Sequence, residues 1–278
     1  LREFRVGETD VTEPYPATST PPSGLGVVLV PWPNRVKDGR WVLDGVEQQL
    51  ALTEPDRQNA IHGLLRYSPY RLVSRDANRV TLGAEIFPQL GYPFHLQTEV
   101  TYALSDAGLT VEHLLHNAGD RRAPVAVGAH PYLKIGGVPT EDLTLTVRAD
   151  RHFEVDERLN VVGEHPVEGT AFDLRAGRRV GDLTLDDGWS DVQQDEAGYG
   201  RHTVAAPDGR SVTLWSDHNF GYVQAYTSRS LATLPAGQVA VAVEPMSAPT
   251  NALNTGRSLT WLEPGDTWRP RWGIGFSL

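Results

Sequence analysis

The chain has 278 residues, 40% of them hydrophobic, so it can bury a large core, and an all-β chain of this size can still form one domain. Its formal net charge of -10 argues against nucleic acid and anionic membrane surfaces as partners, because phosphates would be repelled by most of the surface. The absence of cysteine excludes a disulfide framework, a thiolate metal site and a thiol nucleophile. Neutral ligands such as sugars are compatible with this composition.

The sequence contains no apolar run near the roughly 20 residues that a membrane-spanning helix needs, and its opening, LREFRVGETD, lacks the apolar core of a signal peptide. We therefore expect a soluble protein that contacts no membrane, with the cytoplasm as the default compartment and a monomer or homodimer as its state. The chain begins with Leu1 rather than methionine, which is consistent with a longer native N-terminus.

Turn signals recur at short intervals along the chain and predict antiparallel β-structure. The segment Thr12–Ser23, rich in Pro, Ser and Thr, is typical of an irregular loop. After it, turns are predicted at Asp38-Gly39, Asp76-Ala77-Asn78, Asp106-Ala107-Gly108, Pro207-Asp208-Gly209 and Pro264-Gly265-Asp266. Extended segments with alternating hydrophobicity lie beside most of them.

The segment FHLQTEVTYAL shows this alternation well. It places Phe94, Leu96 and Val100 on one face of a strand, with Gln97 and Glu99 on the other. Further strands are predicted in RVTLGAEIF, LTVEHLLHN, LTLTVRA, SVTLWSD, GYVQAYT, SLTWLEP and WGIGFSL. No segment sustains helical periodicity with caps, so helices should be few and short.

So many strands must either close into a barrel or stack as two sheets, since a single open sheet would expose a hydrophobic face. We predict an all-β fold, a large antiparallel β-sandwich, as a single domain over residues 1–278.

Two stretches share a pattern that points to chemistry: VAVGAHP at Val125–Pro131 and VAVAVEP at Val239–Pro245. If each is a strand, His130 follows small residues on one face, and Glu244 follows Ala240 and Ala242 on one face of the other. The small side chains should leave a groove in front of each ionisable group. A histidine and a carboxylate above a groove are what general acid/base catalysis requires.

Four motifs, PWPNR, NAIHG, GAHPY and VEP, together resemble the aldose 1-epimerase (galactose mutarotase) family. The resemblance runs from LREF through PWPNRVKDGRW, NAIHGLLRYSPY, GAHPYL and VQAYT to AVEPMSAPTNALNTG and LEPGDTW. It implies the large β-sandwich of that family, and a chain that lacks the family's first strands. It also implies an isomerase that interconverts the α and β anomers of a free aldose without a cofactor or metal.

Carried over to this sequence, the resemblance makes Glu244 the base that takes the proton of the anomeric hydroxyl. His130 becomes the acid that protonates the ring oxygen. Arg35 and His62 match sugar contacts of the family. With ordinary pKa values near 6.5 and 4.3, a histidine suits the acid role at neutral pH, and a glutamate, made more basic by partial burial, suits the base role.

A sugar-binding aspartate is also expected in the middle of the chain. The string DHNF at Asp217–Phe220 resembles the family's motif, but it precedes VQAYT and so lies too late in the chain. The earlier LDDGWSDV occupies the expected place, which favours Asp186, with Asp187 as the fallback.

Several polar and aromatic residues have structural explanations. Asn34 and Gln224 can bond to sugar hydroxyls, but buried amides more often bridge loops, and we leave them out of the site. Of the seven tryptophans, Trp32, Trp189 and Trp215 are candidates for stacking on a sugar face.

Two alternative functions stay open. An epimerase of an anionic hexose, phosphorylated at position 6 or sulfonated, would need cations at the far end of the groove, such as Arg35 with Arg66 or Lys134. A non-catalytic carbohydrate-binding or sugar-sensing module would keep the cleft and lose turnover.

Overall fold

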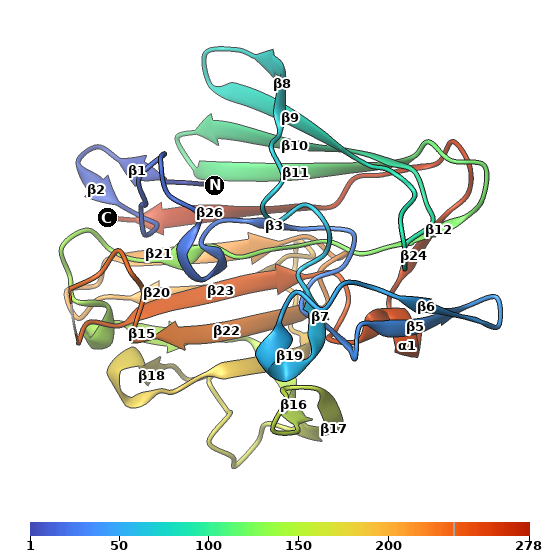
Figure 1. Cartoon of the computed structure of the whole chain (residues 1–278). Coiled ribbons are helices and arrows are strands. Elements are labelled where there is room, and N and C mark those ends of the chain that lie inside the picture. The colour runs from blue at the N-terminus through green and yellow to red at the C-terminus, as the bar shows by residue number, and fades with distance from the viewer. Residues whose placement is uncertain (236) are drawn as a thin grey trace.

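The computed structural model describes residues 1–235 and 237–278, and its regular secondary structure is almost entirely antiparallel β-strand (Figure 1). The larger sheet has the strand order β18 (Arg178–Arg179), β15 (Thr144–Thr146), β20 (Gly200–Ala205), β21 (Ser211–Ser216), β26 (Arg271–Ser277), β11 (Gly108–Asn117), β10 (Leu96–Ser105), β9 (Arg79–Ile86) and β8 (Arg71–Arg75), with β25 (Thr267–Trp268) paired to β11. The predicted strands within residues 79–117 and 211–217 are confirmed here.

The second sheet carries the residues of the predicted site. Its order is β17 (Val161–Pro166), β16 (Ala149–Val155), β19 (Asp186–Val192), β22 (Tyr222–Ser228), β23 (Ala240–Met246), β13 (Gly128–Ala129) and β3 (Val28–Leu29), with β14 (Tyr132–Leu133) paired to β23.

Four two-stranded ribbons complete the β-structure: β1 (Arg5–Val6) with β2 (Thr9–Asp10), β4 (Arg35–Lys37) with β7 (Asn59–Ile61), β5 (Arg40–Leu43) with β6 (Val46–Gln49), and β12 (Ala123–Val125) with β24 (Thr260–Leu262). The helical elements described are α1 (Ala252–Thr255) and the 3₁₀ turns η1 (Pro22–Gly24), η2 (Pro55–Arg57), η3 (Thr140–Asp142) and η4 (Val180–Asp182). Helices are therefore few and short, as predicted. No helix among the described residues is long and apolar enough to span a bilayer.

The two large sheets share one connected apolar core. Val111, Leu214 and Ile274 enter it from the larger sheet, and Val223 and Val243 from the second sheet. The predicted sandwich is therefore confirmed. Burial of these branched side chains drives the stacking of the sheets, because apolar surface is removed from water on both inner faces.

Strand β23 is buried on both faces, and its alternation separates two environments. Val241 and Val243 face the core between the sheets. Ala240 and Ala242 belong to a different apolar cluster, and Glu244 lines a cavity. A strand buried on both sides can therefore hold a carboxylate on the face away from the main core.

Candidate active site

His130 and Glu244 lie opposite each other on neighbouring antiparallel segments. Gly128 pairs with Met246 and Tyr132 with Ala242, so the same register places His130 across from Glu244. The His130 Nε2 atom is 3.3 Å from Glu244 Oε1, and the two side chains are only 6% and 2% exposed. The sequence thus brings its two proposed proton-transfer groups together by strand pairing.

The expected long strand through Val125–Pro131 is interrupted, and this is a correction. Val125 pairs with Thr260 of β24, whereas Gly128 pairs with β23 and β3. Between them the backbone N–H of Ala126 donates to the Pro31 carbonyl and that of Val127 to the Ser247 hydroxyl, so the ladder breaks there.

The groove expected in front of the small residues is also largely filled. The Tyr132 ring packs with Ala240 and Ala242, and it stacks on His130 at a centroid distance of 5.2 Å. The small side chains therefore make room for a tyrosine that supports the histidine ring. The open space lies instead beyond Glu244, towards the β4–β7 ribbon.

The β4–β7 ribbon presents Arg35 and His62 to the same space. Asn34 and His62 face each other at its end, both in the left-handed region with φ of 54° and 63°, and the His62 N–H donates to the Asn34 carbonyl at 2.9 Å. Such φ values are uncommon for residues other than glycine and are frequent at functional sites. The His62 ring meets that of His130 edge-on at 5.5 Å between centroids.

Asp186 and Asp187 lie on opposite faces of β19, so only one of them faces the cavity. Asp186 Oδ2 is 3.3 Å from Arg35 Nη2, and its Oδ1 accepts a hydrogen bond from Gln224 at 2.9 Å. Asp187 pairs with His152 Nε2 at 2.8 Å and does not line the cavity. The structure therefore favours Asp186 over the fallback Asp187 as the carboxylate that faces the cavity.

All five predicted site residues line one polar cavity of about 320 Å³. This volume is within the range of small-molecule sites. Its lining residues are Ser23, Gly24, Asn34, Arg35, Thr53, Glu54, Arg57, Ile61, His62, Arg66, Tyr67, His130, Asp186, Gln224, Tyr226 and Glu244.

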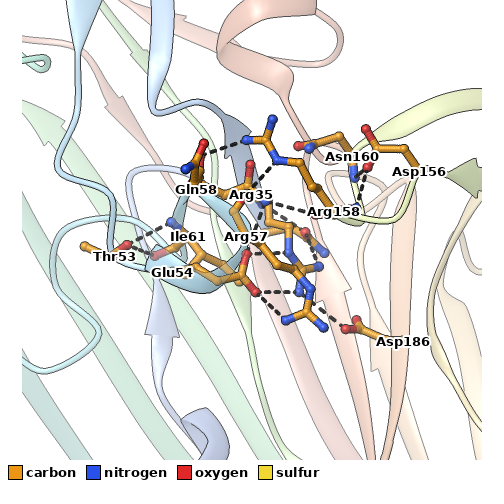
Figure 2. A network of polar contacts seen from close by, with 12 residues as sticks. Arg35, Thr53, Glu54, Arg57, Gln58, Ile61, Asp156, Arg158, Asn160 and Asp186 are labelled. Carbon is orange, nitrogen blue, oxygen red and sulfur yellow. Dashed lines mark hydrogen bonds and ion pairs between the residues drawn. The ribbon is translucent and has the colours of Figure 1, made fainter.

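A network of charges holds Arg35 at the wall of this cavity (Figure 2). Glu54 binds its guanidinium with two oxygens, at 2.9 Å to Nε and 3.0 Å to Nη2. Burial opposes ionisation of Glu54, but its bonds to Arg35 outweigh this, so the pKa of Glu54 lies below its usual value. Asn59 also donates to Glu54, at 3.2 Å.

Burial shifts the pKa values of the central pair in opposite directions. The pKa of Glu244 is well above its usual value because its carboxylate is desolvated, with the charge of Asp186 adding to the effect and Arg35 opposing it. Burial lowers the pKa of His130 to about 4 and that of His62 well below its usual value. The sequence predicted that His130 would keep an ordinary pKa near neutrality, and the structure corrects this. The shifts make Glu244 a stronger base and His130, once protonated, a stronger acid.

Several lining residues were missed or set aside at the sequence level. Gln224 pairs in register with Glu244 and donates a hydrogen bond to Asp186. A single amide in the otherwise largely apolar run YVQAYT was the sequence signal that could have placed it in the site. Arg66 was named only as a possible cation for an anionic hexose, and it does line the cavity. Glu54 was missed, because no local pattern marks it and its place depends on the path of the segment between β6 and β7.

The expected tryptophan platform is a correction. Trp32 and Trp189 belong to the main core, and Trp215 packs on Tyr199 at 5.4 Å between centroids. Among the described residues, none of these three lines the cavity. Burial of Trp32 and Trp189 removes their apolar surface from water, which exposure at a polar pocket would not do.

The string DHNF is a structural turn. Asp217 accepts hydrogen bonds from the backbone N–H groups of Asn219 and Arg271 at 3.0 and 2.8 Å. These contacts satisfy the carboxylate within the turn, away from the cavity.

The fold and site together define a β-sandwich protein with a buried histidine–glutamate pair in a polar cavity, and comparison with known proteins places it in a family. Residues 3–274 match the family model described as aldose 1-epimerase. The uncharacterized protein YihR of Escherichia coli K12 is 33% identical over 267 residues, covering 95% of this chain and 83% of that protein. The chain belongs to the aldose 1-epimerase family.

More distant relatives share the fold. Human galactose mutarotase is 31% identical over 164 residues, which cover 56% of this chain and 47% of that protein. The structure of a galactose mutarotase-like protein from Clostridium acetobutylicum superposes with a TM-score of 0.85 at 15% identity, covering 99% and 88% of the two chains. Galactose 1-epimerase from Lactobacillus acidophilus gives 0.75 at 20% identity, covering 96% and 85%. At these identities the two structures establish the fold alone.

Proposed function

We propose that the protein is an aldose 1-epimerase that interconverts the α and β anomers of a free aldose. The observation that carries the proposal is the contact between His130 and Glu244, 3.3 Å apart in a polar cavity. Anomer exchange requires a proton to leave the anomeric hydroxyl and another to reach the ring oxygen. Both oxygens are bonded to the anomeric carbon, so the base and the acid must lie close together.

The proposed reaction starts from the form of the pair in which Glu244 is ionised and His130 is protonated, and because burial disfavours both charges, Glu244 accepts a proton and His130 gives one up readily. Glu244 takes the proton of the anomeric hydroxyl as His130 protonates the ring oxygen. The bond between the anomeric carbon and the ring oxygen breaks, and an open-chain aldehyde forms. Rotation about the neighbouring carbon–carbon bond presents the other face of the aldehyde. On ring closure the hydroxyl that was the ring oxygen gives its proton back to His130 as it attacks the aldehyde carbon, and Glu244 gives its proton to the aldehyde oxygen. Both groups thus return to their starting protonation states. Arg35, His62 and Asp186 would bind sugar hydroxyls and hold the ring in place.

The test follows the anomer exchange of α-D-glucose and α-D-galactose by polarimetry. We expect Glu244→Gln and His130→Ala each to lower the catalysed rate about 10²- to 10⁴-fold, the usual contribution of a general base or acid. Glutamine preserves the shape of the buried carboxyl, and thermal unfolding verifies that each variant folds. The matched control His165→Gln changes an exposed histidine paired with Glu154 and should keep the wild-type rate. Wild-type rates from Glu244→Gln or His130→Ala contradict the mechanism, and calorimetric sugar binding without faster exchange favours a non-catalytic binding module.

One observation favours the second candidate, epimerisation of an anionic hexose. Arg66 lines the cavity and donates to the Thr53 carbonyl at 3.0 Å, and no ion pair within the described chain involves it. The other cations suggested by the sequence are neutralised: Arg35 by Glu54 and Asp186, and Lys134 by Glu13 at 3.1 Å. Arg66 is therefore the cation that a phosphate or sulfonate would meet.

Comparing Arg66→Gln with Arg122→Gln tests this candidate. Both arginines lie over an aromatic ring, Arg66 over Tyr67 at 4.8 Å and Arg122 over Trp261 at 4.4 Å, but only Arg66 lines the cavity. If the substrate is anionic, Arg66→Gln lowers kcat/KM for a hexose 6-phosphate or 6-sulfonate about tenfold and leaves the neutral hexose unchanged. An equal effect on both sugars, or the same effect from Arg122→Gln, contradicts it.

A further inference from the structure

Three donor groups meet at the cavity, two on the buried residues His130 and Glu244 and one on the partly buried His62. The nitrogen atoms of His62 and His130 and a carboxylate oxygen of Glu244 all lie within 4.8 Å of one another. They come from three different segments: the end of β7, the loop between β13 and β14, and β23. The convergence is therefore a product of the fold rather than of a local sequence motif.

The hydrogen bonding of these side chains is incomplete. In the part of the chain that the structure describes, His62 Nδ1, His130 Nδ1 and Glu244 Oε2 are buried and have no hydrogen-bond partner. Glu244 is 2% exposed and His130 is 5% exposed. Buried polar atoms are nearly always satisfied, so the free atoms of His62 and Glu244 leave these side chains able to bind an external group. His130 would bind it through Nε2, the atom that faces Glu244 Oε1.

We propose that His62, His130 and Glu244 form a binding site for a divalent transition-metal ion of the zinc class. Two imidazoles and one carboxylate form a ligand set that binds zinc, copper and nickel in preference to magnesium and calcium. The open fourth position faces the polar cavity, where water or a sugar hydroxyl can complete the coordination.

The distances require only a small adjustment. Bonds of about 2.0–2.2 Å in a tetrahedral zinc site place ligand atoms roughly 3.3 Å apart. His130 Nε2 and Glu244 Oε1 are already 3.3 Å apart. The remaining donor distances, up to 4.8 Å, would close by movement of the His62 ring, which lies nearly perpendicular to that of His130.

Occupation by the metal has a functional consequence, which rests on the proposed epimerase activity. Coordination engages His130 and the carboxylate of Glu244, the groups that exchange protons with the sugar. Zinc then acts as an inhibitor that competes for the catalytic pair, and removal of the metal restores the rate.

The test begins with binding, which needs no activity. Protein dialysed against EDTA and then against chelator-free buffer is titrated with ZnCl₂ by calorimetry, with MgCl₂ as the comparison, and CoCl₂ reports coordination geometry by its visible absorption. We expect one zinc ion per chain, absorption of tetrahedral Co²⁺, and no comparable binding of magnesium. His62→Gln and Glu244→Gln should each weaken zinc at least about tenfold, because even outer contacts of metal ligands contribute 10- to 100-fold.

The matched control is His165→Gln, which removes an exposed histidine that lies 2.9 Å from the Glu154 carboxylate. Zinc binding that is unchanged in His62→Gln and Glu244→Gln, or that is lost in His165→Gln, overturns the site. The inhibition is measured separately on the wild type by polarimetry with zinc and then with excess EDTA. If zinc binds at the triad and the protein shows no epimerase activity, the site stands and the proposed function fails. An undiminished rate at saturating zinc contradicts the competition.

Discussion

Arg35 keeps a full positive charge in a nearly closed part of the protein, with its side chain 7% exposed. Two carboxylates compensate it: Glu54, with two short contacts, and Asp186 at 3.3 Å. Because the partners approach from different segments, their bonds fix the guanidinium in one orientation at the cavity wall (Figure 2). The bidentate contact indicates that Glu54 positions Arg35, a role for which Glu54 itself need not touch the sugar.

Replacing Glu54 by glutamine tests this role. Glutamine at position 54 removes one of the two ion pairs of Arg35 and leaves Asp186 as its only carboxylate partner among the described residues, so we expect the free energy of unfolding to fall, by at most about 3 kcal/mol. KM for the sugar should rise more than kcat falls, because Arg35 loses its orientation while the acid/base pair is untouched. Glu47→Gln is the control, since Glu47 is 62% exposed and 3.9 Å from Arg40. Urea denaturation and polarimetry make the comparison, and equal behaviour of the two variants speaks against a positioning role.

At this scale the sequence predicts identities better than contacts. The place of LDDGWSDV in the chain favoured this segment over DHNF, and strand alternation then explains why Asp186 faces the cavity and Asp187 does not. Glu54 could not be recognised, because its significance comes from Arg35, and the two meet only after the β4–β7 ribbon has formed. The Arg35–Asp186 contact joins residues 151 positions apart, which no local pattern encodes.

The β4–β7 ribbon is the element that delivers His62, and its geometry depends on the glycine that follows. Gly63 has φ of 70°, and a Cβ atom there would lie 2.1 Å from the Val30 carbonyl oxygen. Strain and close approach both demand glycine at this position. The close approach keeps His62 and Gly63 against the chain at Val30, beside the cavity.

Gly63→Ala should therefore be far more damaging than a similar substitution without the clash. Gly45→Ala is the matched control, because Gly45 has φ of 79° in the β5–β6 turn and nothing lies within 4 Å of its added Cβ. We expect Gly45→Ala to cost about 1 kcal/mol of unfolding free energy, and Gly63→Ala to cost more and to lower the epimerisation rate by displacing His62. Chemical denaturation and polarimetry check both. Equal losses of stability, with equal rates, mean that the close contact is unimportant.

Element boundaries show what alternation can and cannot predict. The periodicity of Leu96–Ser105 follows from a regular ladder with both neighbouring strands, so it was visible in the sequence. The segment Val125–Pro131 looks equally strand-like, yet the N–H groups of Ala126 and Val127 donate to the Pro31 carbonyl and the Ser247 hydroxyl. These partners cause the break between β12 and β13. Because they are distant in sequence, the alternation of the segment could not reveal the break.

Across the whole molecule, the stacked sheets bury titratable groups far from the cavity as well. His113 and His202 lie in the larger sheet and are 2% and 1% exposed. His113 Nε2 accepts a hydrogen bond from the Trp272 indole at 2.9 Å, and His202 Nδ1 accepts one from the Arg148 backbone N–H at 3.2 Å. A nitrogen that accepts a hydrogen bond carries no proton, so both rings are neutral in the folded chain. Burial lowers the pKa of His113 to about 3 and that of His202 to about 4.

These neutral histidines make stability depend on pH between about 6.5 and 4. The unfolded chain binds a proton at each histidine below about 6.5, whereas the folded chain resists it until about 4 at His202. The unfolded state thus holds more protons in this window, and the free energy of unfolding falls as the pH falls. For His202 alone the loss is about 2 kcal/mol at pH 5 and approaches about 3 kcal/mol below pH 4.

His202→Gln isolates this contribution. The substitution disturbs the native hydrogen bond, so the variant should be less stable than wild type at pH 7. Because glutamine does not titrate, the free energy of unfolding of the variant should decline less between pH 6.5 and 4. The gap between the two proteins therefore narrows as the pH falls. Urea unfolding at half-unit steps of pH measures it, with the exposed His165→Gln expected to follow the wild-type curve. If the difference in unfolding free energy between the two proteins stays constant from pH 7 to 4, His202 does not contribute to the loss of stability in acid.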